Sequence, residues 1–366
     1  MSFTLFGLGT AVPSGTLTQT EALRTARALA GPTLRDASWL PTVYEHSEID
    51  TRHQVLGRPL VDDLLKGTRE SNSVFLPSSE ADSRGPTTHE RMQIYAKEAP
   101  HLAVRAAKIA LHESGFDPAT VTQLVTVSCT GFVSPGVDFA IMQALKLRPT
   151  VHRTHVGFMG CHGAINGLRV ANAYAQADPS ARVLLCAVEL CSLHYYYGNE
   201  PDKVIANALF ADGAAAMIGQ QSRDPDRWQI AATGSCLIPD SGYAMGWQVG
   251  DHGFEMILAR QIPVLIAKHL KPWLTSWLSD NGLTLGDVGS WAVHPGGPKI
   301  LTAVQEGLNL SAAAMATSRA VYAEYGNMSS PTVLFIADRL RRENRRRPCV
   351  MLGFGPGLVA EAVLWA

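Results

Sequence analysis

This sequence of 366 residues has almost no excess of charge of one sign, no long apolar run and no Cys-x-x-Cys pair. Its 31 lysines and arginines nearly balance 32 aspartates and glutamates, which argues against a surface whose main task is binding nucleic acid or an anionic membrane. No apolar stretch approaches the roughly 18 residues that span a bilayer, and Met1–Gly15 lacks the basic start of a signal peptide. The 6 cysteines contain no Cys-x-x-Cys pair and are too sparse for a disulfide scaffold. We therefore expect a soluble cytoplasmic protein with reduced thiols and no metal.

The sequence does have a large apolar fraction, 46%, and it lies in short runs. Four apolar runs that end near Gly-rich turns are predicted as strands: Leu124–Cys129, Val183–Val188, Trp291–His294 and Cys349–Gly353. They form two pairs about 165 residues apart, which indicates an internal duplication of βαβ-rich layers with strands buried on both faces. We predict an α/β chain of two halves, 1–222 and 223–366.

Helices are predicted from capping residues and from breaks at proline and glycine. One begins near Thr88, is kinked or split at Pro100, and stops at Gly115. Another apolar-periodic helix is predicted over His252–Trp277, with breaks at its two prolines.

Two polar segments have weaker patterns. Arg35–Pro86 is predicted as surface loop with short helices. Arg339–Arg347 contains six arginines. A solvated helix end is the simpler interpretation of this segment, and a contact for a phosphorylated carrier is the alternative.

Cys161 is the first candidate for chemistry, in Val156-Gly-Phe-Met-Gly-Cys-His-Gly-Ala164. Glycines around it predict a tight turn, and an apolar helical run follows. A thiol at a helix N-terminus meets partial positive charge and free N–H groups, which would lower its pKa and favour the nucleophilic thiolate. A buried structural cysteine is the alternative, and the other five cysteines are assigned to core or loop.

His294 and Asn327 are the second and third candidates. His294 ends a predicted strand and precedes Pro-Gly-Gly, which would hold its side chain rigidly toward a cleft. A hydrogen-bonded interior histidine is the equally weighted alternative. Asn327 follows Gly326, where a simple helix cap is the alternative. Together with Cys161, the His could pair with the thiolate and both side chains could hold a thioester or enolate oxygen, without a metal. Gly353-Phe-Gly-Pro-Gly357 lacks the spacing and the following helix of a dinucleotide loop.

These motifs together resemble the chalcone synthase family, the type III polyketide synthases, within the thiolase superfamily. The resemblance extends from about residue 90 to the C-terminus. It is carried by Gly160-Cys161, Ala208–Ala216, His294-Pro-Gly-Gly-Pro298, Tyr325-Gly-Asn-Met-Ser-Ser330 and Gly353-Phe-Gly-Pro-Gly357.

The resemblance implies a thiolase fold of αβαβα layers, two similar halves and a homodimer. It implies that Cys161 is the acylated nucleophile, that His294 and Asn327 form the oxyanion pair, and that Phe210 is a gatekeeper between substrate tunnel and acyl cavity. The implied reaction is iterative decarboxylative condensation of malonyl-CoA onto an acyl-CoA starter. Coenzyme A thioesters are then substrates, and no cofactor is needed.

Departures from the plant members concern the substrate pocket. Cys191 and His194 stand where plant enzymes have threonines, Met256 replaces a second gatekeeper Phe, and Trp247 replaces a cavity-lining Gly. Ser329 is grouped with these residues as substrate-binding. The changes resemble bacterial members, and the bulk of Trp247 favours an aliphatic starter and alkylpyrone or alkylresorcinol products.

The coenzyme A entrance also departs from the family. Trp39, Thr42 and His46 fall roughly where relatives have basic residues, so an acyl-carrier-protein donor is kept open.

Three alternatives compete with this interpretation. An initiating ketoacyl-ACP synthase would condense only once, a non-catalytic thiolase-fold partner would not react at all, and a Cys-His hydrolase would release free acid without using malonyl-CoA.

Overall fold

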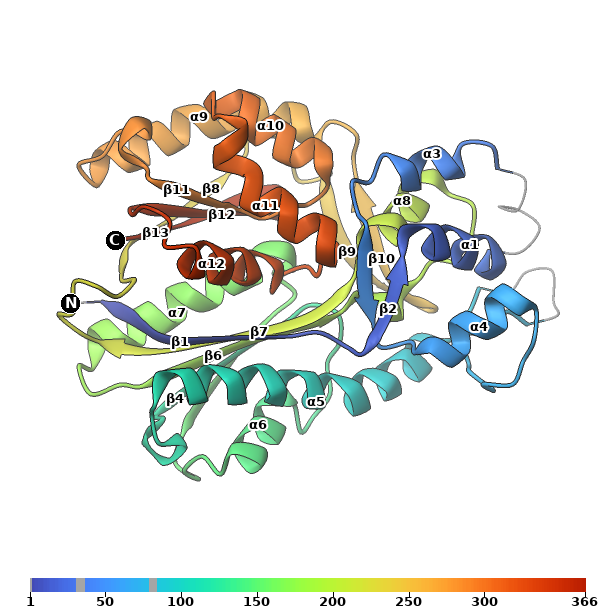
Figure 1. Ribbon diagram of the computed structural model, residues 1–366, viewed down its shortest axis with the longest axis horizontal. Coiled ribbons are helices and arrows are strands. Elements are labelled where there is room, and N and C mark those ends of the chain that lie inside the picture. The colour runs from blue at the N-terminus through green and yellow to red at the C-terminus, as the bar shows by residue number, and fades with distance from the viewer. Residues whose placement is uncertain (1, 31–36, 79–83) are drawn as a thin grey trace.

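A computed structural model describes residues 2–30, 37–78 and 84–366. Its body is built from two mixed sheets (Figure 1). The first has the order β1-β7-β6-β4-β5, with β1 Phe3–Ala11, β7 Asp212–Gln221, β6 Val183–Leu190, β4 Gln123–Ser128 and β5 His152–Gly157. The second has the order β11-β12-β13-β8, with β11 Ser290–Val293, β12 Cys349–Gly355, β13 Val359–Trp365 and β8 Ile230–Leu237. Within the first sheet, β4 pairs parallel to both β5 and β6, and β7 runs antiparallel to β6 and β1.

Helices complete five layers, αβαβα (Figure 1). Between the sheets lie α7 (Gly163–Ala177) and α12 (Thr332–Arg342), and both contact strands of either sheet. The outer face of the first sheet is covered by α5 (Thr88–Ser114) and α6 (Val137–Leu145). The outer face of the second is covered by α9 (Ile262–Asp280) and α10 (Pro298–Leu308), while α11 (Ala312–Tyr325) packs on β11 and α12. This is the layering that the resemblance to the thiolase fold predicted.

A smaller lobe flanks the layered body on the right of Figure 1. It contains the helices α1 (Gln19–Leu29), α3 (Leu40–Glu45), α4 (Arg58–Lys66) and α8 (Pro201–Leu209). It also contains two antiparallel pairs, β2 (Gly15–Thr18) with β3 (Thr51–Gln54) and β9 (Met245–Gly250) with β10 (Gly253–Leu258). Short 3₁₀ turns are η1 (Pro118–Thr120), η2 (Gly160–His162), η3 (Cys191–His194) and η4 (Leu285–Asp287).

The four predicted strands are confirmed as β4, β6, β11 and β12. Every residue of β4 and β6 is buried, as expected for strands with helices on both faces of the sheet. These runs lack the polar alternation of a half-exposed strand, so their continuous apolar character was enough to predict them as buried strands.

Two helix predictions were wrong: neither Pro100 nor Pro272 breaks its helix, and the second helix starts later than expected. The helix from Thr88 is a single helix through Pro100; it is capped by Thr87 with Glu90 and ends at Gly115, whose φ of 69° is left-handed. The helix predicted over His252–Trp277 begins only at Ile262, because residues 253–258 form β10. Pro263 lies in the first turn, where its missing N–H costs no hydrogen bond.

Of the predicted loop Arg35–Pro86, residues 35–36 and 79–83 lie outside the described residues. The remainder contains the short helices α3 and α4, as predicted, and also the strand β3, which was not.

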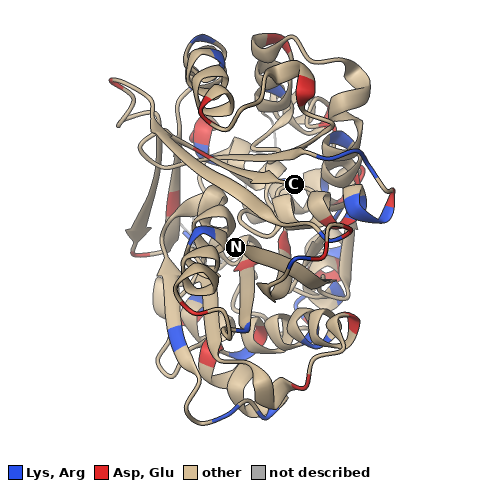
Figure 2. Ribbon diagram, turned by 90° about the vertical axis from the view of Figure 1, so that its left-hand side faces the viewer, with Lys and Arg blue, Asp and Glu red and all other residues tan. Residues whose placement is uncertain are grey.

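The arginine-rich segment fits the simpler interpretation. Arg339 pairs with Glu324, Arg342 with Asp338, and Arg345 with Glu343. Basic and acidic residues are interspersed across the face in Figure 2. Over residues 2–30, 37–78 and 84–366, no helix combines the length and apolar character that a membrane span requires.

Candidate active site

Cys161 lies on a strained turn between β5 and α7. Phe158 has a φ of 58° and Gly160 a φ of 68°, both in the left-handed region, and the turn places Cys161 in η2 just before α7 begins at Gly163. A β-carbon on Gly163 would come within 2.9 Å of the Val127 side chain, so the helix packs tightly on β4. The predicted thiol at a helix N-terminus is therefore confirmed.

The Gly353–Gly357 motif forms the opposite wall of this turn. A β-carbon on Gly160 would lie 2.5 Å from Cδ of Pro356, and one on Gly355 would overlap the ring of His162. The glycines thus allow β12 and its following turn to approach the nucleophile closely. Since β13 follows instead of a helix, the motif is structural and not a dinucleotide loop.

His294 stands directly after β11 and is buried. Its backbone N–H donates to the carbonyl of Leu352 at 2.8 Å, which continues the pairing with β12. Neither ring nitrogen has a hydrogen-bond partner among the described residues.

Asn327 is held by its backbone and by one side-chain oxygen. Its N–H donates to Leu209 at 2.9 Å, its carbonyl accepts from Ala211 at 2.8 Å, and it forms a β-bridge with Phe210. Its Oδ1 accepts from the backbone N–H of Ser329 at 2.8 Å. The amide orientation is therefore set, and Nδ2 is left buried without a partner among the described residues.

One cavity of about 500 Å³ brings the three candidates together. Cys161, His294 and Asn327 line it, although they come from three segments far apart in the sequence. Its walls are mostly apolar, with Val43, Ile205, Leu209, Met245, Leu258, Ile262, Ile300 and Phe354. Its lining residues that are exposed to solvent mark the mouth: Thr42, His46, Asp202, Arg260 and Lys299.

Burial dominates the electrostatics of the site. It raises the pKa of the Cys161 thiol to about 11, the charge of Glu189 acts in the same direction, and the nearby Ser329 hydroxyl and Asn327 amide only partly oppose it. Burial, aided by His162, lowers the pKa of His294 to about 3. The resting site therefore favours a neutral thiol beside a neutral imidazole. The sequence-based expectation of a lowered thiol pKa is wrong here, because burial in the cavity desolvates the thiolate.

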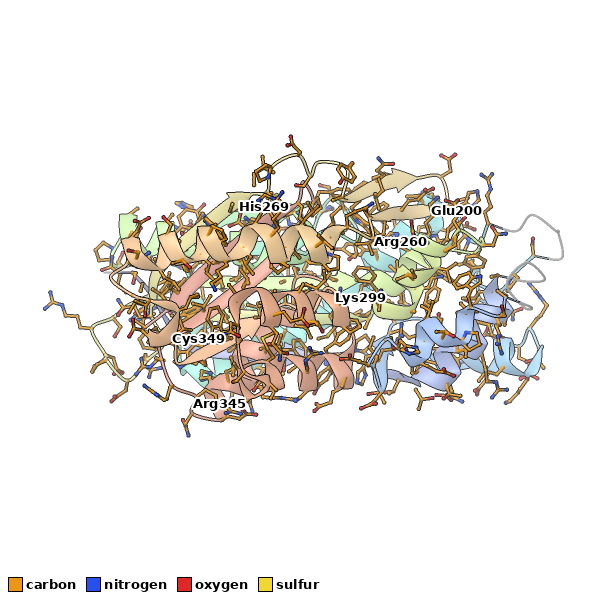
Figure 3. All side chains as sticks on the ribbon, turned by 90° about the horizontal axis from the view of Figure 1, so that it is seen from above. Glu200, Arg260, His269, Lys299, Arg345 and Cys349 are labelled. Atoms are coloured by element: carbon orange, nitrogen blue, oxygen red, sulfur yellow. The ribbon has the colours of Figure 1, made fainter. Side chains whose placement is uncertain are left out.

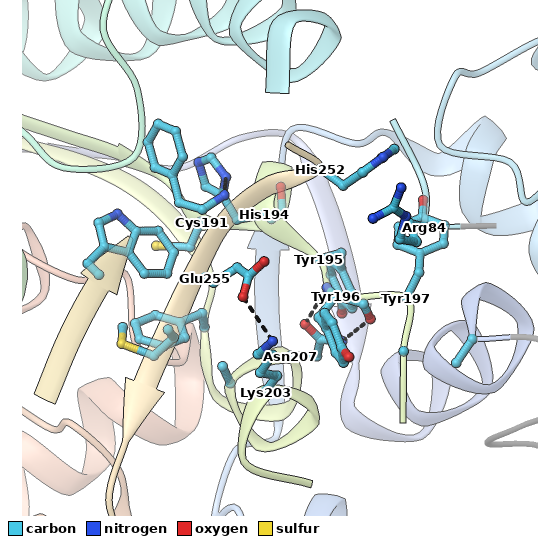
Figure 4. Close-up of a pocket in the computed structure, with 18 of the residues that line it drawn as sticks. Arg84, Cys191, His194, Tyr195, Tyr196, Tyr197, Lys203, Asn207, His252 and Glu255 are labelled. Atoms are coloured by element: carbon cyan, nitrogen blue, oxygen red, sulfur yellow. Dashed lines mark hydrogen bonds and ion pairs between the residues drawn. The ribbon is translucent and has the colours of Figure 1, made fainter. Parts of the chain in front are cut away.

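A second cavity of about 720 Å³ is shown in Figure 4. Phe210 and Met256 line both this cavity and the first. Cys191, His194 and Trp247 line it, as the sequence predicted for a substrate pocket. Towards its other end the lining becomes polar, with Arg84, Tyr196, Lys203, His252 and Glu255.

Two of these pocket residues have no hydrogen-bonding capacity left for a substrate. His194 Nε2 bonds to the carbonyl of Thr130 at 2.6 Å, and its Nδ1 accepts from the N–H of Phe254 at 2.9 Å. Trp247 donates its Nε1–H to the carbonyl of Cys129 at 2.6 Å. His194 and Trp247 therefore present ring faces, and the part of the cavity near Phe210 is apolar in character.

Ser329 lines neither cavity. It is buried with a φ of 56°, and its hydroxyl lies 3.5 Å from Sγ of Cys129. The Ser329 hydroxyl also acts on the thiol of Cys161, so it lies beside that residue and not along the wall of either cavity.

Glu189 was missed by sequence reasoning. This buried carboxylate accepts from the backbone N–H groups of Cys129 and Thr130 and from the hydroxyls of Thr130 and Ser330. It connects the loop after β4 with the segment that follows Asn327. The sequence feature that could have identified Glu189 is that it is an acidic residue in the otherwise apolar strand β6.

Fold and site define a condensing enzyme of the thiolase fold. The chain belongs to the chalcone and stilbene synthases, the type III polyketide synthases: residues 2–222 match the family's N-terminal domain and residues 229–366 its C-terminal domain. Such enzymes are acyl-condensing transferases, which answers the sequence-based alternatives of a single-step initiating synthase, an inactive partner and a hydrolase.

Relatives support this assignment over nearly the whole chain. An alpha-pyrone synthesis polyketide synthase-like protein, Pks18 of Mycobacterium tuberculosis, is 32% identical over 98% of this chain and 90% of its own. The 1,3,6,8-tetrahydroxynaphthalene synthase of Streptomyces peucetius is 36% identical over 72% of each. Among solved structures, PKS-I of the brown alga Ectocarpus siliculosus has a TM-score of 0.91 at 30% identity, covering 100% of this chain and 98% of that one.

Gly160→Ala tests the turn that carries the nucleophile. A non-glycine residue in the left-handed region costs about 1–2 kcal/mol, and the added methyl would also strike Pro356. We expect a lower melting temperature and a loss of turnover that exceeds the loss of folded protein. Gly67→Ala, at a left-handed helix end with open space around it, is the matched control; equal activity losses in the two variants would contradict the assignment.

Proposed function

We propose that Cys161 takes an acyl group from a coenzyme A thioester and that the chain extends it repeatedly with malonyl-CoA. The observation that carries this proposal is the pair of buried donors, on His294 and Asn327, that line the cavity of Cys161 and have no hydrogen-bond partner in the part of the chain that the structure describes. A buried donor without a partner is costly unless a ligand completes it. A thioester or enolate oxygen would complete both.

Loading begins with a neutral pair. His294 accepts the thiol proton as the sulfur of Cys161 attacks the thioester carbonyl, and the proton then passes to the departing coenzyme A thiolate. The acyl group ends on Cys161 and free coenzyme A leaves.

Extension uses the same donors. The neutral imidazole N–H of His294 and the Nδ2–H of Asn327 donate to the thioester oxygen of malonyl-CoA, so that carbon dioxide leaves as an enolate forms. The enolate carbon attacks the acyl group on Cys161, the sulfur is expelled and regains a proton, and the extended β-ketoacyl chain can be reloaded. The apolar walls limit water, which would otherwise protonate the enolate.

Separate half-reactions test these roles. We expect Cys161→Ala to make no extended product but to keep malonyl-CoA decarboxylation, because both donors remain. His294→Ala and Asn327→Ala should each lose decarboxylation by about 100-fold, as found when one oxyanion donor is removed. Liquid chromatography of acetyl-CoA formed from malonyl-CoA measures this step, with melting curves to confirm folding. Full decarboxylation by Asn327→Ala would contradict the proposed role.

We propose an aliphatic starter and alkylpyrone or alkylresorcinol products. The starter would extend from Cys161 past Phe210 into the second cavity, where the faces of Trp247, His194 and Phe254 offer apolar walls. The bulk of Trp247 leaves less width for an aromatic ring than a glycine would. The name of the mycobacterial relative, an alpha-pyrone synthesis enzyme, agrees with this product class.

Trp247→Gly tests the starter preference. With malonyl-CoA and a panel of acyl-CoA starters, the native chain should prefer aliphatic ones, and the variant should gain at least several-fold in kcat/KM for aromatic starters. Val249→Gly, an exposed position of the same β9–β10 pair, is the matched control. Mass spectrometry of the products decides, and a native preference for aromatic starters would overturn the proposal.

We propose coenzyme A as the carrier of both substrates, with no cofactor or metal. Among the exposed residues at the cavity mouth, Thr42 and His46 carry no fixed positive charge, as the sequence indicated, but Arg260 and Lys299 do. Both are exposed on the face seen in Figure 3, where they can meet phosphate groups. Carrier-protein thioesters belong in the same starter panel, and turnover with them alone would reject this donor.

We propose a homodimer formed along β5. This strand is an edge of the first sheet, and a group of exposed apolar residues accompanies it: Phe132, Val133, Phe139, Phe158 and Met159. An exposed strand edge beside apolar surface is a natural site for a second copy of the chain.

Light scattering after size exclusion tests the dimer. The native protein should have twice the 39.4 kDa mass of one chain, and Phe139→Glu should shift it towards a single chain. Val264→Glu, on an exposed position of α9, should leave the mass unchanged. A native protein of single-chain mass would contradict the proposal.

A further inference from the structure

We propose that the buried guanidinium of Arg52 is a positioning group for the active site, fixing the backbone around Phe210 and, through it, the amide of Asn327. Its catalytic consequence rests on the proposed function, whereas its structural basis rests on contacts alone. Arg52 lines neither cavity, so it would act only through other residues.

Arg52 contacts several backbone carbonyls at once. It comes from β3, and its side chain is buried. Its Nη1 donates to the carbonyls of Asn207 at 2.8 Å and Phe210 at 3.1 Å, and its Nη2 donates to the carbonyl of Ala208 and to Oε1 of Gln19. One side chain thus binds three carbonyls within a stretch of four residues.

The end of α8 explains why a guanidinium stands here. The last carbonyls of a helix have no partner within the helix and carry the negative end of its dipole. No carboxylate among the described residues forms an ion pair with Arg52. Its direct partners are carbonyl oxygens, and the charge of the buried Asp212 carboxylate favours it without direct contact. A planar fork with donors on two nitrogens reaches these carbonyls together, which a lysine ammonium could not.

The clamped segment leads directly to Asn327. The carbonyl of Leu209, between the clamped residues, accepts from the N–H of Asn327, and the N–H of Ala211 donates back to the carbonyl of Asn327. Phe210 pairs with Asn327 in the same bridge. Any displacement of the end of α8 would therefore move both the residue between the two cavities and the oxyanion donor.

Gln19 extends the clamp to the wall of the catalytic cavity. Its Oε1 accepts from Arg52, and its Nε2 donates to the carbonyl of Ala208 at 3.2 Å and to the hydroxyl of Ser47 at 2.5 Å. Ser47 lines the cavity that holds Cys161. Arg52 and Gln19 therefore join the cavity wall, Phe210 and Asn327 into one rigid unit.

Hydrogen exchange tests the positioning without reference to activity. In Arg52→Ala, the amides of Ala211 and Asn327 should exchange faster than in the native protein, while those of α5 should not change. Gln19→Leu removes one arm of the clamp and should give a smaller effect; it serves if Arg52→Ala does not fold. Arg345→Ala, a paired surface arginine, is the control. Unchanged exchange at both amides in a folded variant would overturn the inference, whether or not the proposed reaction is found.

Coupling of the two half-reactions tests the catalytic consequence. In Arg52→Ala, Phe210 and Asn327 should be held less firmly. We therefore expect product formation to fall by about tenfold and the number of malonyl-CoA molecules decarboxylated per molecule of product to rise. Guanidinium ion, compared with sodium chloride at equal ionic strength, should restore part of the coupling in Arg52→Ala, which a general loss of stability would not allow. A native-like coupling ratio in an active Arg52→Ala enzyme would overturn the role in catalysis.

Discussion

The active site depends on buried hydrogen-bonding atoms, the ring nitrogens of His294 and Nδ2 of Asn327, that have no partner among the described residues. Each unsatisfied group costs about 1–3 kcal/mol in a folded protein. His294 and Asn327 can stay in this state only because their backbones are fixed by strand β12 and by the segment around Phe210. The unsatisfied groups make the cavity complementary to an oxygen that develops charge, so that part of the free energy lost in folding is recovered when substrate binds.

The layered fold makes this arrangement possible. The loops that carry Cys161 and Cys129 follow the parallel strands β5 and β4, and His294 follows β11, which is parallel to β12. In such sheets the carboxyl ends of strands present residues to a shared crevice. The turn of Cys161 packs against the end of β12, so the active site lies where the two sheets meet, and the smaller lobe encloses it with α3, α8 and the β9–β10 pair.

The sequence alone was enough to propose the three candidate residues that lie in distinctive motifs. Cys161, His294 and Asn327 sit in short motifs whose glycines report close packing or a left-handed backbone, and the buried strands lack polar alternation. Functions that depend on where side-chain hydrogen bonds go could not be predicted. Trp247 lines the second cavity, but its N–H is used by the carbonyl of Cys129, and Ser329 lines neither cavity and contacts Cys129. Arg52 has no local signature at all, because three of its four acceptors are backbone carbonyls 155 to 158 residues away.

Burial shifts the pKa values of Cys161 and His294 in opposite directions, and each shift favours the uncharged form of the group. The pKa of Cys161 rises to about 11 and that of His294 falls to about 3. In the proposed loading step both groups would therefore start neutral, so that the charge forms where bound substrate, and not water, can receive it. The same low pKa keeps the imidazole neutral for decarboxylation. In that step its N–H must hydrogen-bond to the enolate oxygen without transferring the proton. One desolvated histidine can in this way serve as base in loading and as donor in extension, and the apolar walls that desolvate it are the walls that exclude water.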